Sequence, residues 1–194
     1  VIYNGMDDTG ITLQERKSRT PEILFVGRIS REKGVICLLN ALNKVASRGY
    51  FCKLKLVGQC TGYMSSHIRK AYKQLKIDIL GTVSFNELKE LYTTNTIGVI
   101  PSLHEQCSYV AIEMMAYGIP LVGTDTTGLK EMLEDECYIS VEYIEGKKDL
   151  IMNALTENLL TVLSLNRHKR IRDQSWKYNI ENVKLQLLSF YLGM

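Results

Sequence analysis

The chain has 194 residues, of which 45% are hydrophobic and 23% charged, and its formal net charge is +3. This length and composition suit one well-buried domain of an ordinary soluble protein. The small net charge is spread evenly along the sequence and argues against a nucleic-acid partner.

The first twenty residues differ from the rest of the chain. Turn-forming residues at 4–8 are followed by a wholly polar run at 14–19. We therefore expect a loosely ordered lead-in over 1–20, followed by a single domain over 21–194.

From residue 21 onward, short apolar runs alternate with segments whose apolar residues recur at spacings of three and four. The short runs end in Gly, Pro or polar residues and predict β-strands at 22–27, 52–58, 77–81, 96–101, 120–124 and 137–141. The intervening segments predict helices at 35–48, 63–76, 86–94, 109–117 and 127–133. From residue 147 the pattern is wholly helical, with a last helix expected at 175–191.

Strand and helix alternate in the way that parallel crossover connections require. We predict an α/β fold: a Rossmann-like, doubly wound parallel sheet of about six strands, with helices on both faces and a helical C-terminal tail. Gly49 and Gly118 follow two of the helices and suit the left-handed closing position.

Two glutamates eight positions apart, Glu105 and Glu113, mark a candidate binding site. The first lies in the loop at the carboxyl end of the strand 96–101, and the second lies in the helix 109–117. An open α/β sheet binds ligands at this edge, and a carboxylate accepts hydrogen bonds from the vicinal hydroxyls of a sugar. Alone, Glu105 is better explained as an acid that stabilises a helix N-terminus. Glu113 stands in an apolar segment, where an unpaired carboxylate would be costly, so we expect ribose hydroxyls or a basic side chain beside it.

A second candidate site follows the first strand. Gly27 leaves room for a pyrophosphate, Arg28 and Lys33 supply cations, and Gly34 opens the next helix, whose amides point at an anion. Without the glutamate pair, an ordinary basic turn would explain this loop better than a phosphate site does.

The glutamate spacing together with the Gly-Arg-x4-Lys-Gly loop resembles the signatures of retaining glycosyltransferases with the GT-B fold, the group 1 family. The resemblance covers nearly the whole chain, from 1–7, which is similar to the family's interdomain segment, to the closing helix around Trp176. It implies that the chain is the C-terminal, nucleotide-sugar-binding half of a metal-independent hexosyltransferase that moves a sugar from an NDP-sugar to a hydroxyl acceptor, in polysaccharide or glycoconjugate biosynthesis.

The resemblance also implies roles for individual residues. Arg28 and Lys33 hold the diphosphate and are catalytic together with Glu105, which approaches the donor sugar, whereas Glu113 takes the ribose hydroxyls. Further contacts to base or phosphate are implied for Gly27, Val83, Gln106, Cys107, Ser108 and Tyr109. The family usually carries a Gly-Phe-Gly or Pro-Phe-Gly turn at 106–108, and its absence here leaves the sugar open. Ser108 is in addition the expected N-cap of its helix. If Glu105 contacts only the sugar, its removal leaves the affinity for a free NDP nearly unchanged.

Cofactors and partners follow from the same comparison. No His-x-x-x-His, Cys-x-x-Cys or Asp-x-Asp pair is present, so we expect no metal and no other cofactor. The acceptor site is expected in an N-terminal domain that precedes Val1, because the chain begins without Met or a signal peptide. The odd number of cysteines indicates a reducing compartment, the cytoplasm, and no apolar run approaches the roughly 20 residues that span a bilayer. The basic cluster 167–172 is explained by a solvated helix face or by a peripheral membrane contact of the full enzyme.

Two rival functions stay open. The chain could belong to a GT-B enzyme of other chemistry, such as a phosphorylase or a sugar-nucleotide epimerase. It could also be a non-enzymatic module that binds a nucleotide or a partner through the same sheet.

Overall fold

The computed structural model describes residues 20–94, 97–105, 108–126, 129, 138–142 and 148–164. The lead-in up to residue 19, the expected final helix at 175–191, the basic cluster 167–172 and all but one residue of the helix expected at 127–133 lie outside the described residues. None of the described helices is long and apolar enough to cross a membrane.

The described residues form a six-stranded sheet in which every neighbouring pair of strands is parallel. The strands are β1 (Glu22–Val26), β2 (Lys53–Val57), β3 (Lys76–Gly81), β4 (Ile97–Ile100), β5 (Leu121–Asp125) and β6 (Tyr138–Glu142). Their order across the sheet is β3-β2-β1-β4-β5-β6. This is the strand order of a Rossmann fold, and it confirms the predicted doubly wound sheet.

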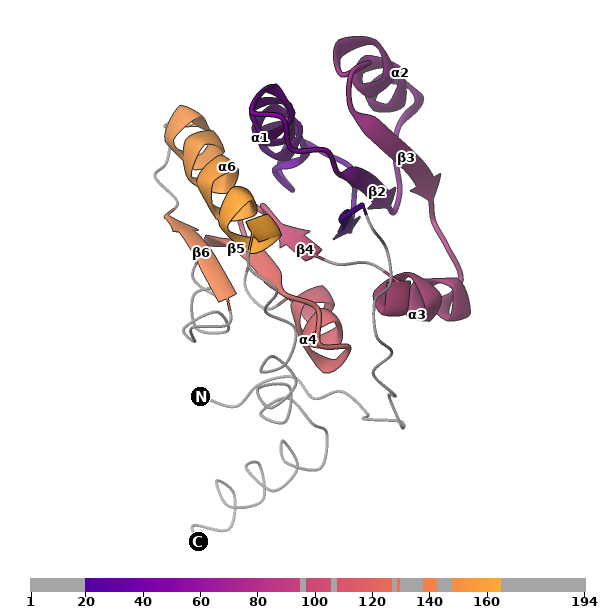
Figure 1. Cartoon of the computed structure of the whole chain (residues 1–194). Coiled ribbons are helices and arrows are strands. Elements are labelled where there is room, and N and C mark those ends of the chain that lie inside the picture. The colour runs from indigo at the N-terminus through magenta and orange to yellow at the C-terminus, as the bar shows by residue number, and fades with distance from the viewer. Residues whose placement is uncertain are drawn as a thin grey trace, which may run out of the picture.

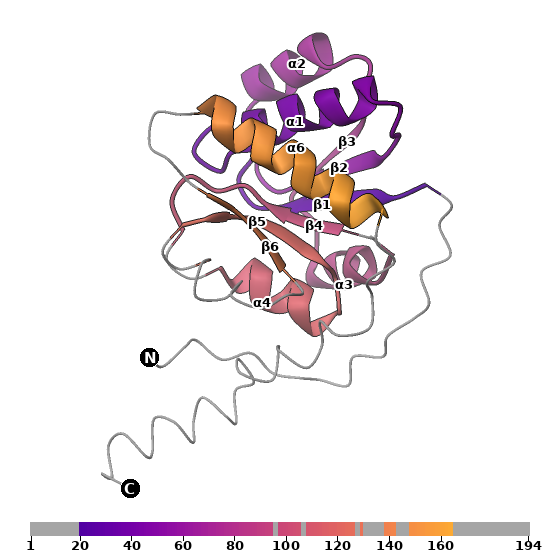
Figure 2. The ribbon, with the colours of Figure 1, turned by 60° about the vertical axis from the view of Figure 1, so that its left-hand side comes forward.

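Helices cover both faces of the sheet (Figures 1 and 2). Three lie on one face: α1 (Val35–Ser47), α2 (Gly62–Ala71) and α6 (Lys148–Ser164). Two lie on the other: α3 (Phe85–Thr94) and α4 (Tyr109–Ala116). The two layers follow from the topology, since a right-handed crossover places its helix on opposite faces when the chain moves in opposite directions across the sheet.

Each face has its own hydrophobic core because side chains alternate along the strands. Ile23 and Phe25 of β1 pack against α1 and α6, whereas Leu24 between them packs against the opposite layer with Ile112 and Met114 of α4. All five side chains are at most 2% exposed. Each contributes about 1.5–3 kcal/mol by leaving water, so the middle of the sheet is firmly held.

One predicted boundary is wrong. The helix expected at 63–76 ends at Ala71, and its last predicted residue, Lys76, begins β3 instead. The apolar spacing continued beyond the helix end because Tyr72 and Leu75 still pack into the same core from the turn that follows. The strand must begin at Lys76 because this residue is paired with Lys53 in the register of β2 and β3.

The topology fixes where a ligand could enter. The chain runs outward from β1 to β2 and β3 and then crosses back to β4, so the connections after β1 and β4 diverge. A crevice at the carboxyl ends of these two strands is the usual binding position in such sheets. The described segments that border it are 27–34, 101–105 and the residue Ser108.

Candidate functional site

The loops after β1 and β4 are fastened to each other at the switch point of the sheet. The backbone N–H of Leu103 donates a hydrogen bond of 3.0 Å to the carbonyl of Glu32. Gly34 adopts a left-handed conformation with φ 69°, and a Cβ at this position would lie 1.7 Å from the carbonyl oxygen of Pro101. Only glycine satisfies both the backbone angle and the close approach. The two loops thus form one structural unit at the start of α1.

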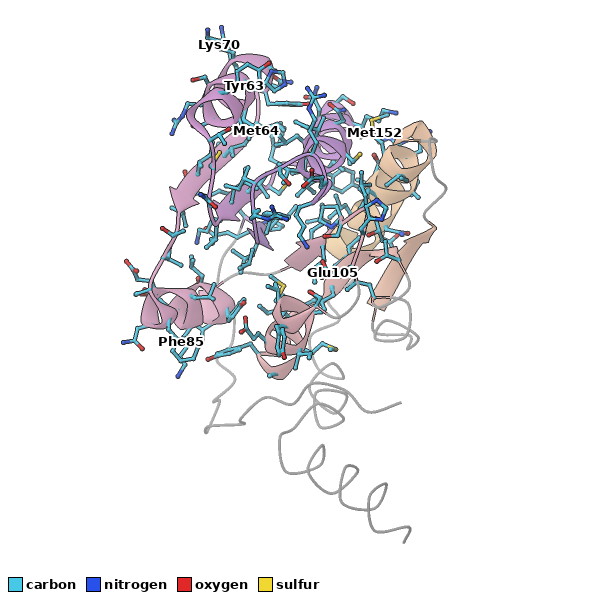
Figure 3. The ribbon with its side chains drawn as sticks, turned by 180° about the vertical axis from the view of Figure 1, so that it is seen from behind. Tyr63, Met64, Lys70, Phe85, Glu105 and Met152 are labelled. Carbon is cyan, nitrogen blue, oxygen red and sulfur yellow. The ribbon has the colours of Figure 1, made fainter. Side chains whose placement is uncertain are left out.

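Lys33 and Glu105 face each other across this unit. The Lys33 Nζ donates a hydrogen bond of 2.9 Å to the Glu105 Oε2, and the two side chains are only 27% and 14% exposed. Figure 3 shows Glu105 near the middle of the domain, at the level of the sheet. The structure therefore joins the two sequence motifs, which are 72 positions apart, through one partly buried ion pair.

Arg28 differs from Lys33 in its surroundings. It is exposed and forms no ion pair with any residue in the described part of the chain. Its backbone is nevertheless held in place, because the flanking N–H groups of Gly27 and Ile29 donate hydrogen bonds to the carbonyls of Val57 and Gln59, each 2.9 Å long. The loop thus presents, from a fixed backbone, a guanidinium that has no ion pair with the described residues.

The start of α4 borders the same crevice. Ser108 is the N-cap as expected: its Oγ accepts a hydrogen bond of 3.2 Å from the N–H of Ala111, and the residue is 5% exposed. Tyr109, the first helical residue, is 52% exposed. The amides at this end carry the positive end of the helix dipole, which favours an anion. Gln106 and Cys107 lie outside the described residues.

Glu113 is half-buried and has a partner other than the one expected. Its Oε2 accepts a hydrogen bond of 2.5 Å from the hydroxyl of Tyr92 in α3, where sequence reasoning expected ribose hydroxyls or a basic side chain. Tyr92 is 2% exposed, and burial together with the adjacent Glu113 charge raises the pKa of its hydroxyl far above its ordinary value. Its hydroxyl therefore stays protonated and remains a donor at any physiological pH.

Val83 lies farther along the same edge of the sheet. It follows β3, is half-buried and packs against the core on the α3 and α4 side. The next residue, Ser84, caps α3 by exchanging hydrogen bonds with Glu87. Because β3 is two strands from β1, Val83 is roughly 10 Å from the Gly27 loop across the sheet.

The described residues contain no group of three His, Cys, Asp or Glu side chains that could hold a metal ion. The charged residues assigned to the site from the sequence are Arg28, Lys33 and Glu105, in segments that border the crevice, and Glu113 in α4; the exposed Arg31 and Glu32 also lie in these segments. Sequence reasoning missed Tyr92, whose only signal is a tyrosine among polar residues in a short helix.

The sheet order and the glycine-containing loop at its switch point define a Rossmann-like domain. The chain belongs to the family of glycosyl transferases group 1, whose model matches residues 20–164. It is 33% identical over 153 residues to an uncharacterized glycosyltransferase of Methanocaldococcus jannaschii, in a match that covers 70% of this chain and 38% of that protein. It is 29% identical over 158 residues to the alpha-maltose-1-phosphate synthase of Mycobacterium tuberculosis, with 70% of this chain and 39% of that protein covered. The chain thus spans well under half the length of these relatives.

Solved structures have the same fold. The lipopolysaccharide outer core galactosyltransferase WaaB in its apo form matches with a TM-score of 0.75 at 19% identity, over 100% of this chain and 56% of that one. The sucrose-phosphate synthase of Thermosynechococcus elongatus matches with a TM-score of 0.70 at 23% identity, over 90% of this chain and 45% of that one. At these identities the likeness concerns the fold alone.

Proposed function

We propose that this chain is the donor-binding domain of a retaining hexosyltransferase, which binds an NDP-sugar and works with a separate acceptor-binding domain. One observation carries the proposal: the ion pair between Lys33 and Glu105 sets a cation for a diphosphate next to a carboxylate for a sugar. The pair lies at the switch point of the sheet, where such folds bind their ligands.

The charges suit the chemistry of glycosyl transfer. When the bond between the sugar and the diphosphate breaks, negative charge accumulates on the leaving phosphate. Arg28 offers a forked donor and Lys33 a point charge, so together they stabilise that charge, while amides at the start of α4 add further donors. These groups suffice for a diphosphate site that does not require a divalent metal.

The carboxylates serve the two sugars of the donor. Glu105, beside Lys33, accepts hydrogen bonds from hydroxyls of the transferred hexose. Glu113 accepts them from the ribose, and the base lies toward Val83 at the end of β3. Two relatives support transfer of a hexosyl group to a hydroxyl acceptor in the biosynthesis of a polysaccharide or glycoconjugate: the alpha-maltose-1-phosphate synthase and a glycogen synthase of Mycobacterium tuberculosis. The chain is 32% identical to that glycogen synthase over 135 residues, which cover 68% of this chain and 33% of that protein.

Calorimetric titration with UDP, GDP and ADP tests the proposal. We expect at least one of them to bind with a dissociation constant in the micromolar to millimolar range, and Arg28→Ala to weaken that binding by about 1.5–3 kcal/mol, the range for hydrogen bonds to charged groups. Arg69→Ala is the matched control, because Arg69 is also exposed, has no ion pair in the described part of the chain and lies in α2, on a helix outside the crevice. The proposal fails if no nucleotide binds, or if both variants have the same effect.

A further inference from the structure

The contact between Tyr92 and Glu113 joins two helices that otherwise approach the candidate site separately. Tyr92 belongs to α3 and Glu113 to α4, and the hydroxyl and the carboxylate oxygen are 2.5 Å apart. The Tyr92 ring also packs on the ring of Tyr117, with 5.2 Å between centroids and an angle of 39° between planes. The donor is thus fixed from two sides, by its hydrogen bond and by an aromatic neighbour.

A hydroxyl this well buried needs a hydrogen-bond acceptor, and the Glu113 carboxylate supplies it. The same hydrogen bond restricts the orientation of the Glu113 side chain. A glutamate side chain on a helix has several rotatable bonds, and a free one samples many orientations. The Tyr92 hydroxyl holds the Glu113 Oε2 in one place. The lone pairs of the carboxylate that do not accept from Tyr92 therefore point in fixed directions.

Helix α3 also begins next to the segment that would face the base. Ser84 caps the helix directly after Val83, and Tyr92 lies eight residues farther on, which is about 12 Å along a helix axis. One helix therefore connects the segment assigned to the base with the residue that holds the Glu113 carboxylate.

We propose that Tyr92 is a positioning residue that orients the Glu113 carboxylate toward the 2′ and 3′ hydroxyls of the nucleotide ribose, and that it makes the site select ribonucleotides over deoxyribonucleotides. The inference rests on the proposed donor-binding function and assigns a specificity determinant within that same site. It differs from a purely structural role, in which Tyr92 would stabilise the packing of α3 on α4 without influencing which nucleotide binds.

The experiment compares two ligands on one variant. The 194-residue chain and its Tyr92→Phe variant are titrated with the ribonucleoside diphosphate that the parent binds best and with its 2′,3′-dideoxy analogue. We expect the parent to prefer the ribonucleotide and Tyr92→Phe to reduce that preference about five- to tenfold, mainly by weakening ribonucleotide binding. The ratio of the two affinities is insensitive to any partial unfolding of the variant, since unfolded molecules bind neither ligand.

Tyr72→Phe is the matched control. Tyr72 is also a buried tyrosine, and its hydroxyl donates a hydrogen bond of 2.7 Å to Asn40 Oδ1, but it packs in the core on the opposite face of the sheet. Its loss removes the same chemical group and leaves the ratio unchanged. In a Glu113→Ala background, Tyr92→Phe should likewise have no further effect on the ratio, because its target is gone.

The outcomes separate the inference from the function on which it rests. If the parent does not distinguish the two ligands, the ribose role of Glu113 is wrong and the positioning role falls with it. If the parent distinguishes them and Tyr92→Phe does so equally well, the ribose site stands and Tyr92 is structural only. A Tyr92→Phe variant that weakens both ligands by the same factor also overturns the positioning role.

Discussion

The ion pair between Lys33 and Glu105 makes an unusual prediction for the variant Glu105→Gln. In the absence of ligand, the Lys33 ammonium is neutralised by the Glu105 carboxylate at 2.9 Å. A diphosphate that binds Lys33 must draw this cation away from the carboxylate and must also tolerate the negative charge beside it. Removing the charge of Glu105 should therefore strengthen the binding of a free NDP. This revises the expectation from sequence, in which Glu105 met only the sugar and its loss left NDP affinity unchanged.

The size of the effect follows from the exposure of the pair. Fully exposed ion pairs contribute about 0.2–1 kcal/mol, and hydrogen bonds to charged groups contribute about 1.5–3 kcal/mol. With side chains that are 27% and 14% exposed, the pair lies between these cases, at about 1–2 kcal/mol. The Gln variant retains a neutral acceptor of the same shape and loses most of this free energy. Its NDP affinity should thus rise roughly 5- to 30-fold.

Calorimetry with NDP and with the matching NDP-sugar checks this value. Glu105→Gln should bind NDP more tightly than the parent and should lose part of the additional affinity that the sugar provides. Glu157→Gln is the control, because it removes an ion pair of 2.7 Å with Arg48 on the exposed surface and changes the net charge equally. An NDP affinity of Glu105→Gln at or below that of the parent refutes the proposed competition for Lys33.

Three further predictions concern the frame of the site. Gly34→Ala should lower the free energy of unfolding by about 3 kcal/mol in a denaturant titration, because an alanine there would be strained by the left-handed backbone and would collide with the Pro101 carbonyl. Gly62→Ala, with open space around its Cβ, should leave stability nearly unchanged, and equal effects of the two variants would contradict the packing of the two loops. Ser108→Ala removes the cap on the Ala111 N–H and should cost about 0.5–2 kcal/mol in thermal unfolding, and an unchanged melting temperature would show that the cap is dispensable. NDP binding should persist in EDTA with the same dissociation constant, and loss of binding on chelation would show that the diphosphate needs a divalent metal.

Most of the fold was accessible from the sequence because it depends on local periodicity. The strands are short apolar runs and the helices repeat at three and four, so all six strands and the helices α1, α3 and α4 were predicted within a few residues of their observed bounds. For α6 only the start of a helical region at residue 147 was predicted. The end of α2 was missed because Leu75, partly buried, packs against the core from a turn and continues the helical spacing. Periodicity reports which side chains are buried, not which backbone conformation buries them.

The site could be predicted only in part from the sequence, because its contacts join residues that are far apart in the chain. The four charged residues were recognised from their spacing, and Ser108 was recognised as a cap from its position before an apolar helix. The contacts between them were not, since Lys33 and Glu105 are 72 positions apart and Tyr92 is 21 positions from Glu113. Pairings of this kind depend on strand order and on the crossing of helices, which no local pattern encodes.

A crystal structure of the chain with the NDP-sugar that it binds most tightly tests the proposed donor site most directly. We predict the diphosphate between Arg28 and Lys33, the ribose hydroxyls on Glu113, and the Lys33 Nζ within hydrogen-bond distance of a phosphate oxygen in place of Glu105. A ligand bound away from the crevice between β1 and β4, or bound there with the pair between Lys33 and Glu105 intact and the diphosphate elsewhere, would contradict it.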